Sequence, residues 1–144
     1  MAASDPLNAL ATLVVKTGVG LGGLTLAQRE LVLALAATVL VSGSAVSEPD
    51  VNLLLRRCLA EEGAFLDTDH VELRRWLVDF HVLDRDGYGR VYTAGAPAAD
   101  IAGSCEQLAG VDLPAVARAA RDADAALRAQ RKERWQNAER DTRG

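Results

Sequence analysis

Residues 69–80 constrain the fold most, because their apolar side chains recur with the period of an α-helix. These side chains share the spacing i, i+3, i+4 and i+7 and therefore one helix face: Leu73, Trp76, Leu77 and Phe80. Asp69 stands three residues before Glu72, which is the spacing of a capping box, so the helix is predicted to begin there. Arg74 and Arg75 fall outside the apolar stripe and are left for solvent or a partner.

Two β-prone runs follow this helix, at residues 82–85 and 90–93. The residues between them include Gly87 and Gly89, which can adopt the positive φ angles of tight turns. The pattern predicts a β-hairpin that is short enough to form a wing.

Another helix is predicted to begin at Glu48, after the capping residue Ser47 and a short strand at residues 45–46. Its buried stripe has helical spacing: Val51, Leu54, Leu55, Cys58 and Leu59. The joint to the next helix is longer than the turn of a typical helix-turn-helix. The order of strand, helix, helix and hairpin predicts a winged helix-turn-helix-like domain.

Several local motifs of this segment form a recognisable set: residues 48–52, Leu54 with Leu55, Leu73-Arg74-Arg75, Leu77-Val78-Asp79, Leu83, Arg85, Gly87 and Tyr92. On these motifs the chain resembles the bacterial "domain of unknown function 2087" family over about residues 47–92. That family is a winged-helix-like module sometimes attached to arsenical-resistance-type transcriptional regulators. The chain departs from the pattern at His81, where a glycine is expected, and at Pro49, where a charged residue is usual. The resemblance implies a fold and a class of protein, and it implies no reaction.

The residues before this segment are predicted to form two helices. Asp5 and Pro6 are a start signal for a helix over residues 1–17, and residues 18–23 are a glycine-rich run that we interpret as a flexible connector. A phosphate-binding loop is disfavoured because the run follows a helix and lacks the Gly-Lys-Ser/Thr ending. Thr25 and a glutamine three residues later predict the start of a buried central helix that runs to about Val41.

The chain after this segment predicts a connector and a long helix. Residues 94–112 are rich in Gly, Ala and Pro and predict a connector with one helical turn. Leu113 and Pro114 open a helix that runs to about Arg140. Its thin apolar face suits a helix that lies across the domain or one that pairs with a copy of itself: Val116, Ala120, Ala123, Leu127 and Trp135.

The predicted fold is mainly α, with a winged helix-turn-helix-like domain, a small β-hairpin wing and flanking N- and C-terminal helices. The predicted segments are an N-terminal helix with its glycine-rich connector, the winged-helix-like domain, a second connector and a C-terminal helix: residues 1–23, 24–93, 94–112 and 113–144. A hydrophobic fraction of 49% is sufficient for a packed core.

The sequence contains few residues in patterns that are typical of a catalytic site. Neither Cys58 nor Cys105 stands in a zinc-binding spacing, and His70 and His81 are too far apart for an i, i+4 metal pair. No nucleophile motif of a hydrolase is present. We therefore expect no enzyme activity, no metal and no cofactor. The absence of a signal peptide and of a long apolar run favours a cytoplasmic protein that does not enter a membrane.

Charge leaves two functions open. Residues 48–92 hold six arginines against ten acidic residues, a net charge of −4, whereas residues 115–144 hold eight basic against five acidic residues, a net charge of +3. DNA affinity depends on phosphate neutralisation, so a DNA-binding transcriptional regulator would need a local basic patch. The candidates for that patch lie on the second helix and the wing: Arg74, Arg75, Arg85 and Arg90.

The alternative for each of these arginines is an ordinary solvated position. The corresponding function is a protein-protein interaction or adaptor module, as a homodimer or as a subunit of a larger assembly. The candidate partner contacts lie on the terminal helices: Leu7, Leu10, Leu127 and Trp135.

Overall fold

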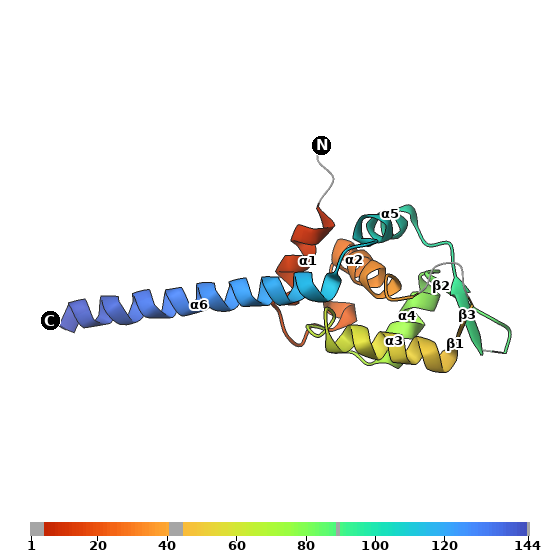
Figure 1. Ribbon diagram of the computed structural model, residues 1–144, viewed down its shortest axis with the longest axis horizontal. Helices are drawn as coiled ribbons and strands as arrows, with labels where there is room; N and C mark the ends of the chain where they lie inside the picture. The colour runs from red at the N-terminus through yellow and green to blue at the C-terminus, as the bar shows by residue number, and fades with distance from the viewer. Residues whose placement is uncertain (1–4, 41–44, 89, 144) are drawn as a thin grey trace.

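The computed structural model describes residues 5–40, 45–88 and 90–143, which form six α-helices, one 3-10 helix and a three-stranded antiparallel sheet (Figure 1). The elements in chain order are α1 Pro6–Val14, η1 Leu21–Gly23, α2 Leu26–Ala37, β1 Val46–Ser47, α3 Glu48–Ala60, α4 His70–Asp79, β2 Leu83–Arg85, β3 Val91–Ala94, α5 Ala99–Leu108 and α6 Leu113–Arg143. The predicted mainly α architecture with a small hairpin is confirmed. The start of the first predicted helix, the predicted helix end at Val41 and the turn residue Gly89 lie outside the described residues.

The segment from α2 to β3 has the topology of a winged helix. Its elements follow in the order α2, β1, α3, α4, β2 and β3, and the strands lie side by side in the order β1, β3, β2. Val46 pairs with Tyr92 and Leu83 pairs with Ala94, so the hairpin is joined to the strand that precedes α3. The hairpin therefore has a fixed position beside α3 and α4.

Side chains cap four helices at the positions that the sequence predicts. Asp5 accepts a hydrogen bond from the first turn of α1, Ser47 accepts one from α3, and Asp69 accepts one from α4. Thr25 and Gln28 form a complete capping box at α2, with the hydrogen bonds running in both directions. These contacts satisfy amide groups that a helix leaves unpaired at its N-terminus, so the helix starts are determined locally.

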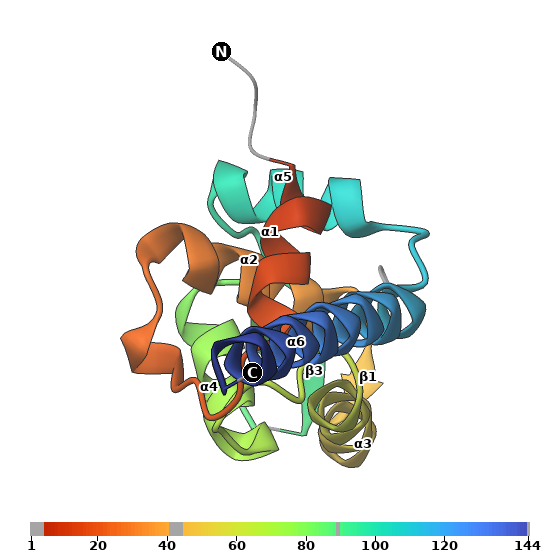
Figure 2. The same ribbon diagram turned by 90° about the vertical axis from the view of Figure 1, so that its left-hand side faces the viewer.

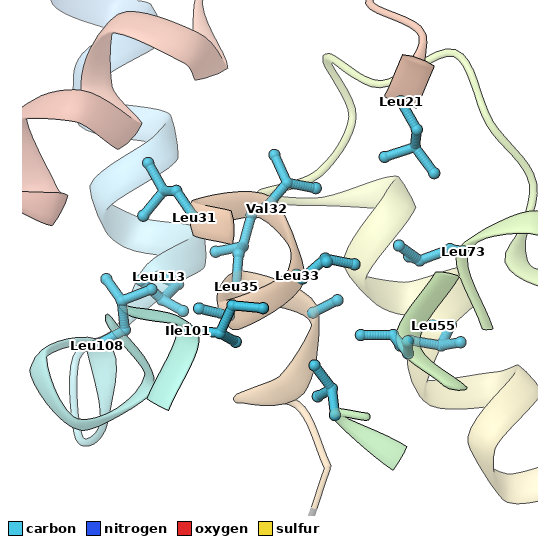
Figure 3. Close-up of a cluster of buried hydrophobic side chains, with 14 of the residues drawn as sticks. Leu21, Leu31, Val32, Leu33, Leu35, Leu55, Leu73, Ile101, Leu108 and Leu113 are labelled. Atoms are coloured by element: carbon cyan, nitrogen blue, oxygen red, sulfur yellow. The ribbon is translucent and has the colours of Figure 1, made fainter. Parts of the chain in front are cut away.

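α2 is the centre of the hydrophobic core. Every residue from Leu31 to Ala36 is buried, which requires neighbours on all sides of the helix. In Figure 3 the side chains of α2 reach Ile101 and Leu108 of α5 in one direction and Leu55 and Leu73 of α3 and α4 in the other. The helix ends at Ala37 and continues as turns through Leu40, so it is shorter than predicted.

The glycine-rich run differs from the predicted flexible connector. Leu21 is buried, and the amide of Val19 donates to the carbonyl of Phe65 at 3.0 Å. The amide of Asp67 donates back to the carbonyl of Val19 at 2.8 Å. The run is therefore attached to the joint between α3 and α4, because both segments need partners for their backbone groups.

The predicted connector over residues 94–112 is mostly helix α5. Ile101, Cys105 and Leu108 lie at i, i+4 and i+7, and this stripe packs against α2. The prediction was wrong because Gly103 and Ser104 lie inside the helix and weaken its local signal. Contact with α2 stabilises α5 despite these residues.

α6 is the longest element, with 31 residues and a length of about 46 Å. Its first turns pack on the domain, and Arg121 anchors it by donating to the carbonyls of Val14 at 3.2 Å and Glu61 at 2.9 Å. All the described side chains after Asp124 are exposed. Figure 1 shows this part extending away from the other elements, and Figure 2 looks along it.

The end of α4 sets the path of the chain into the wing. The amide of Val82 donates to the carbonyl of Leu77 at 2.9 Å and the amide of His81 donates to that of Val78 at 3.1 Å, which together are a Schellman motif. His81 has a φ of 61°, in the left-handed region that favours glycine. Its carbonyl is so close to Gly95 that a Cβ there would lie 2.2 Å away. Only glycine fits at position 95 without a backbone shift.

We predict that His81→Gly raises the free energy of unfolding by about 0.5–1 kcal/mol, because it removes the Cβ strain of a left-handed residue. Urea unfolding followed by circular dichroism measures the change. The control is His70→Gly, which places glycine in the first turn of α4 and should destabilise the protein by up to about 1 kcal/mol. A loss of stability with His81→Gly would contradict the role assigned to the φ angle.

Candidate nucleic-acid interface

Arg74 on α4 is held inside the domain. Its guanidinium donates to the side-chain carbonyl of Asn52 and lies 3.2 Å from the carboxylate of Glu48, both on α3. It also lies 5.9 Å from the ring centroid of Tyr92 on β3, and only 17% of its side chain is exposed. Arg74 therefore ties α3, α4 and the sheet together, and we name these contacts the Arg74 brace.

The Arg74 brace gives Arg74 a structural role that disfavours the predicted contact with nucleic acid. A guanidinium shared between a carboxylate and an amide has given up donors that a phosphate would need. Sequence reasoning missed this role because Asn52 and Glu48 lie 22 and 26 residues away from Arg74 along the chain. Asn52 and Glu48 were therefore not recognised as functional partners.

The three other candidate arginines are exposed. Arg75 lies on α4, Arg85 ends β2, and Arg90 precedes β3. Arg75 and Asp79 have the spacing of a helical ion pair, but no such pair forms between these two described residues. The structure thus leaves one helix arginine and two hairpin arginines accessible.

The hairpin turn is shaped by a carboxylate. One oxygen of Asp86 accepts from the amides of Tyr88 at 3.2 Å and Arg90 at 2.9 Å. Gly87 lies outside the positive-φ region that glycine allows. Tyr88 is 86% exposed at the tip, beside Arg85 and Arg90 in the chain.

α4 packs on the core through a second arginine contact. The guanidinium of Arg29 on α2 lies 4.8 Å from the ring centroid of Trp76, and the Trp76 ring stacks on Phe80 with centroids 5.6 Å apart. Leu73 and Leu77 are completely buried beneath. The predicted apolar face of α4 is confirmed, and it fixes the rotation of the helix so that Arg75 faces away from the core.

The four candidate partner residues divide into two pairs. Leu10 is completely buried, and Leu7 packs against the same core, so the apolar face of α1 is covered by other elements of the same chain. This burial disfavours Leu7 and Leu10 as partner contacts. Leu127 is 50% exposed and Trp135 is 65% exposed, both on the extended part of α6. These two remain available to a partner.

A buried acid at the end of α3 was missed by sequence reasoning. Glu62 is only 3% exposed, and burial raises its pKa above the ordinary value of 4.5. Burial and the Glu62 carboxylate also raise the pKa of the Cys58 thiol, which hydrogen-bonds to Glu62. The sequence Glu61-Glu62-Gly63 contains no pattern that distinguishes the buried glutamate from the exposed one.

Within residues 5–40, 45–88 and 90–143, no three His, Cys, Asp or Glu side chains gather closely enough to hold a metal ion. Across the same described ranges, no helix combines the length and apolarity needed to cross a bilayer.

The fold and its exposed helix and hairpin define a winged-helix-like module. Residues 25–94 match the family described as "Uncharacterized protein conserved in bacteria (DUF2087)". The resemblance stated from local motifs is thereby confirmed, and it extends back to include all of α2. No curated protein and no solved structure matches the chain.

We predict that Arg74→Ala lowers the free energy of unfolding by about 1–3 kcal/mol, because it leaves Asn52 and Glu48 without their shared donor. Arg74→Lys should recover only part of the loss, since an ammonium lacks the planar fork. The matched control is Arg75→Ala on the same helix, which should stay within about 0.5 kcal/mol of the parent protein. Equal effects at both positions in urea unfolding would contradict the Arg74 brace.

We predict that Glu62→Gln stabilises the protein at pH 8 and that the gain shrinks as the pH falls towards 4.5. A carboxyl whose pKa is raised on folding favours the folded state only while it is protonated, so its contribution is lost as the pH rises through the folded pKa. Urea unfolding of both proteins across this range measures the difference. Glu133→Gln at an exposed position of α6 is the control, and it should give no such gain at pH 8.

Proposed function

We propose that the chain is a non-enzymatic, cytoplasmic DNA-binding regulator of the winged-helix type. α4 is the helix presented to duplex DNA, and the β2–β3 hairpin contacts the sugar-phosphate backbone beside it. The observation that carries the proposal is the accessibility of Arg75, Arg85 and Arg90 on these two neighbouring elements, while Arg74 holds α4 in place.

Because the domain is acidic overall, its affinity for DNA depends on where the arginines lie. Asp84 and Asp86 lie in the same hairpin as Arg85 and Arg90, so the basic patch is small. Asp86 is engaged with backbone amides of the turn. A patch of three arginines supports few phosphate contacts, and the affinity should therefore be moderate and strongly dependent on salt.

We further propose that α6 joins two copies of the chain. Figure 1 places the extended part of α6 and the hairpin at opposite ends of the molecule, so a partner on α6 leaves α4 and the hairpin free. Leu127 and Trp135 are separated by eight residues and lie toward the same side of the helix. Two copies would present two winged helices, which is how symmetric regulators read paired half-sites.

We predict that duplex DNA binding, followed by fluorescence anisotropy, weakens steeply between about 20 and 200 mM salt. Replacing Arg75, Arg85 and Arg90 together by alanine should lower affinity at least about tenfold and reduce the salt slope by about one unit for each lost contact.

The matched control removes the same charge from exposed positions outside α4, the hairpin and the Leu127–Trp135 face of α6: Lys16→Ala, Arg57→Ala and Arg140→Ala. This triple variant should bind DNA with the affinity of the parent protein. Undetectable binding by the parent protein at the lowest salt, or equal losses in the two triple variants, would contradict the proposed surface.

A protein-interaction module is the second candidate. The net charge of −4 over residues 48–92 favours it, because an acidic surface repels phosphate and attracts basic proteins. This function predicts no DNA affinity at any salt concentration together with stable self-association. The anisotropy measurement therefore separates the two candidates.

We predict that Leu127→Asp with Trp135→Asp raises the dissociation constant of the dimer at least about tenfold, because each places a charge in the apolar contact. Sedimentation equilibrium measures it. Ala129→Asp with Gln136→Asp is the control, since it adds the same charge to exposed positions farther round the same helix. A parent protein that stays monomeric up to about 100 μM would contradict the role of α6.

A further inference from the structure

A cavity of about 640 Å³ lies between the end of α2, the root of the hairpin, α5 and the start of α6. Its volume falls within the roughly 300–1,000 Å³ that small-molecule sites occupy, and it is far larger than the voids of a packed core. Its walls come partly from the winged helix and partly from the segment that follows it in the chain. The cavity is thus a product of α5 and α6 packing onto that module.

The lining is apolar with one deeply placed charge. Val39, Val46 and Leu113 are among the apolar residues that line it. Among the described lining residues the charged ones are Glu62, which is 3% exposed, and Glu106, which is exposed. Both are acidic, and no described lysine or arginine lines the cavity to balance them. Such a lining excludes anions and favours a donor or a cation.

We propose that this cavity binds a small, largely apolar molecule whose amine or other nitrogen donor faces Glu62. The apolar body replaces water along the walls, and the nitrogen gives the buried Glu62 carboxyl a further donor beside the Cys58 thiol. This proposal does not rest on DNA binding.

The position of the cavity connects it to the rest of the domain. Tyr92 lines the cavity and is also the aromatic residue of the Arg74 brace. Cys105 on α5 lines it as well and is half-buried, whereas Cys58 is only 2% exposed. A ligand therefore touches the sheet residue beneath α4 and covers the more accessible of the two thiols.

Two dyes with the same ring system test the proposal. N-phenyl-1-naphthylamine is neutral and carries one N–H donor, whereas 1-anilinonaphthalene-8-sulfonate adds a negative charge to the same skeleton. The full-length protein should bind the neutral dye saturably, at one site per chain, with at least about tenfold higher affinity than the sulfonate. Glu62→Gln should bring the affinities for the two dyes closer together, because it removes the buried charge.

Two further measurements show where on the protein the dye binds. Ala102→Phe places a ring in the cavity from α5 and should abolish binding of the neutral dye. In the unmodified chain, saturating dye should slow alkylation of Cys105 by N-ethylmaleimide about tenfold, with Cys105→Ser identifying the signal. The second measurement does not depend on the folding of a cavity variant.

Three results would overturn the proposal. The first is no saturable binding of the neutral dye up to its solubility. The second is binding that leaves the alkylation rate of Cys105 unchanged, which would place the dye elsewhere, for example on Trp135 of α6. The third is equal affinity for the two dyes, which would remove Glu62 from the recognition of the ligand.

Discussion

The other helices are arranged around α2 because α2 is buried. A helix with six consecutive buried residues has no solvent side over that stretch, so it must be surrounded. α3 and α4 cover it in the manner of a winged helix, and α5 and α1 cover the remainder. The N- and C-terminal helices are therefore parts of one core with the winged helix, although the matching family spans only residues 25–94.

Within that core the orientation of α4 is determined by polar contacts as much as by apolar ones. Leu73 and Leu77 fix which side faces inward, and the Arg74 brace fixes the helix against α3 and the sheet. The Schellman motif at His81 then directs the chain into β2. These features hold α4 and the hairpin, which carry the exposed Arg75, Arg85 and Arg90, as neighbouring elements. The same packing leaves the cavity between the hairpin root and α5.

Much of the fold was predictable from short-range patterns. The caps at Thr25, Ser47 and Asp69, the apolar stripe of α4 and the hairpin follow from residues within a few positions of one another. α5 was not predictable in this way, because a glycine and a serine inside it obscure a stripe that only α2 makes stable. The candidate interface was predicted in part. Arg75, Arg85 and Arg90 are exposed as expected, while Arg74, one position from Arg75, is not.

Helix starts, apolar helix faces and the hairpin after α4 depend on spacings of two to four residues, so they can be predicted from the sequence. The tertiary structure decided how adjacent residues with the same chemistry are used. Arg74 reaches Asn52 and Glu48 across the domain while Arg75 stays in solvent, and Glu62 is buried while Glu61 is exposed. Such differences arise from contacts between segments distant in the chain, and local periodicity carries no information about those contacts.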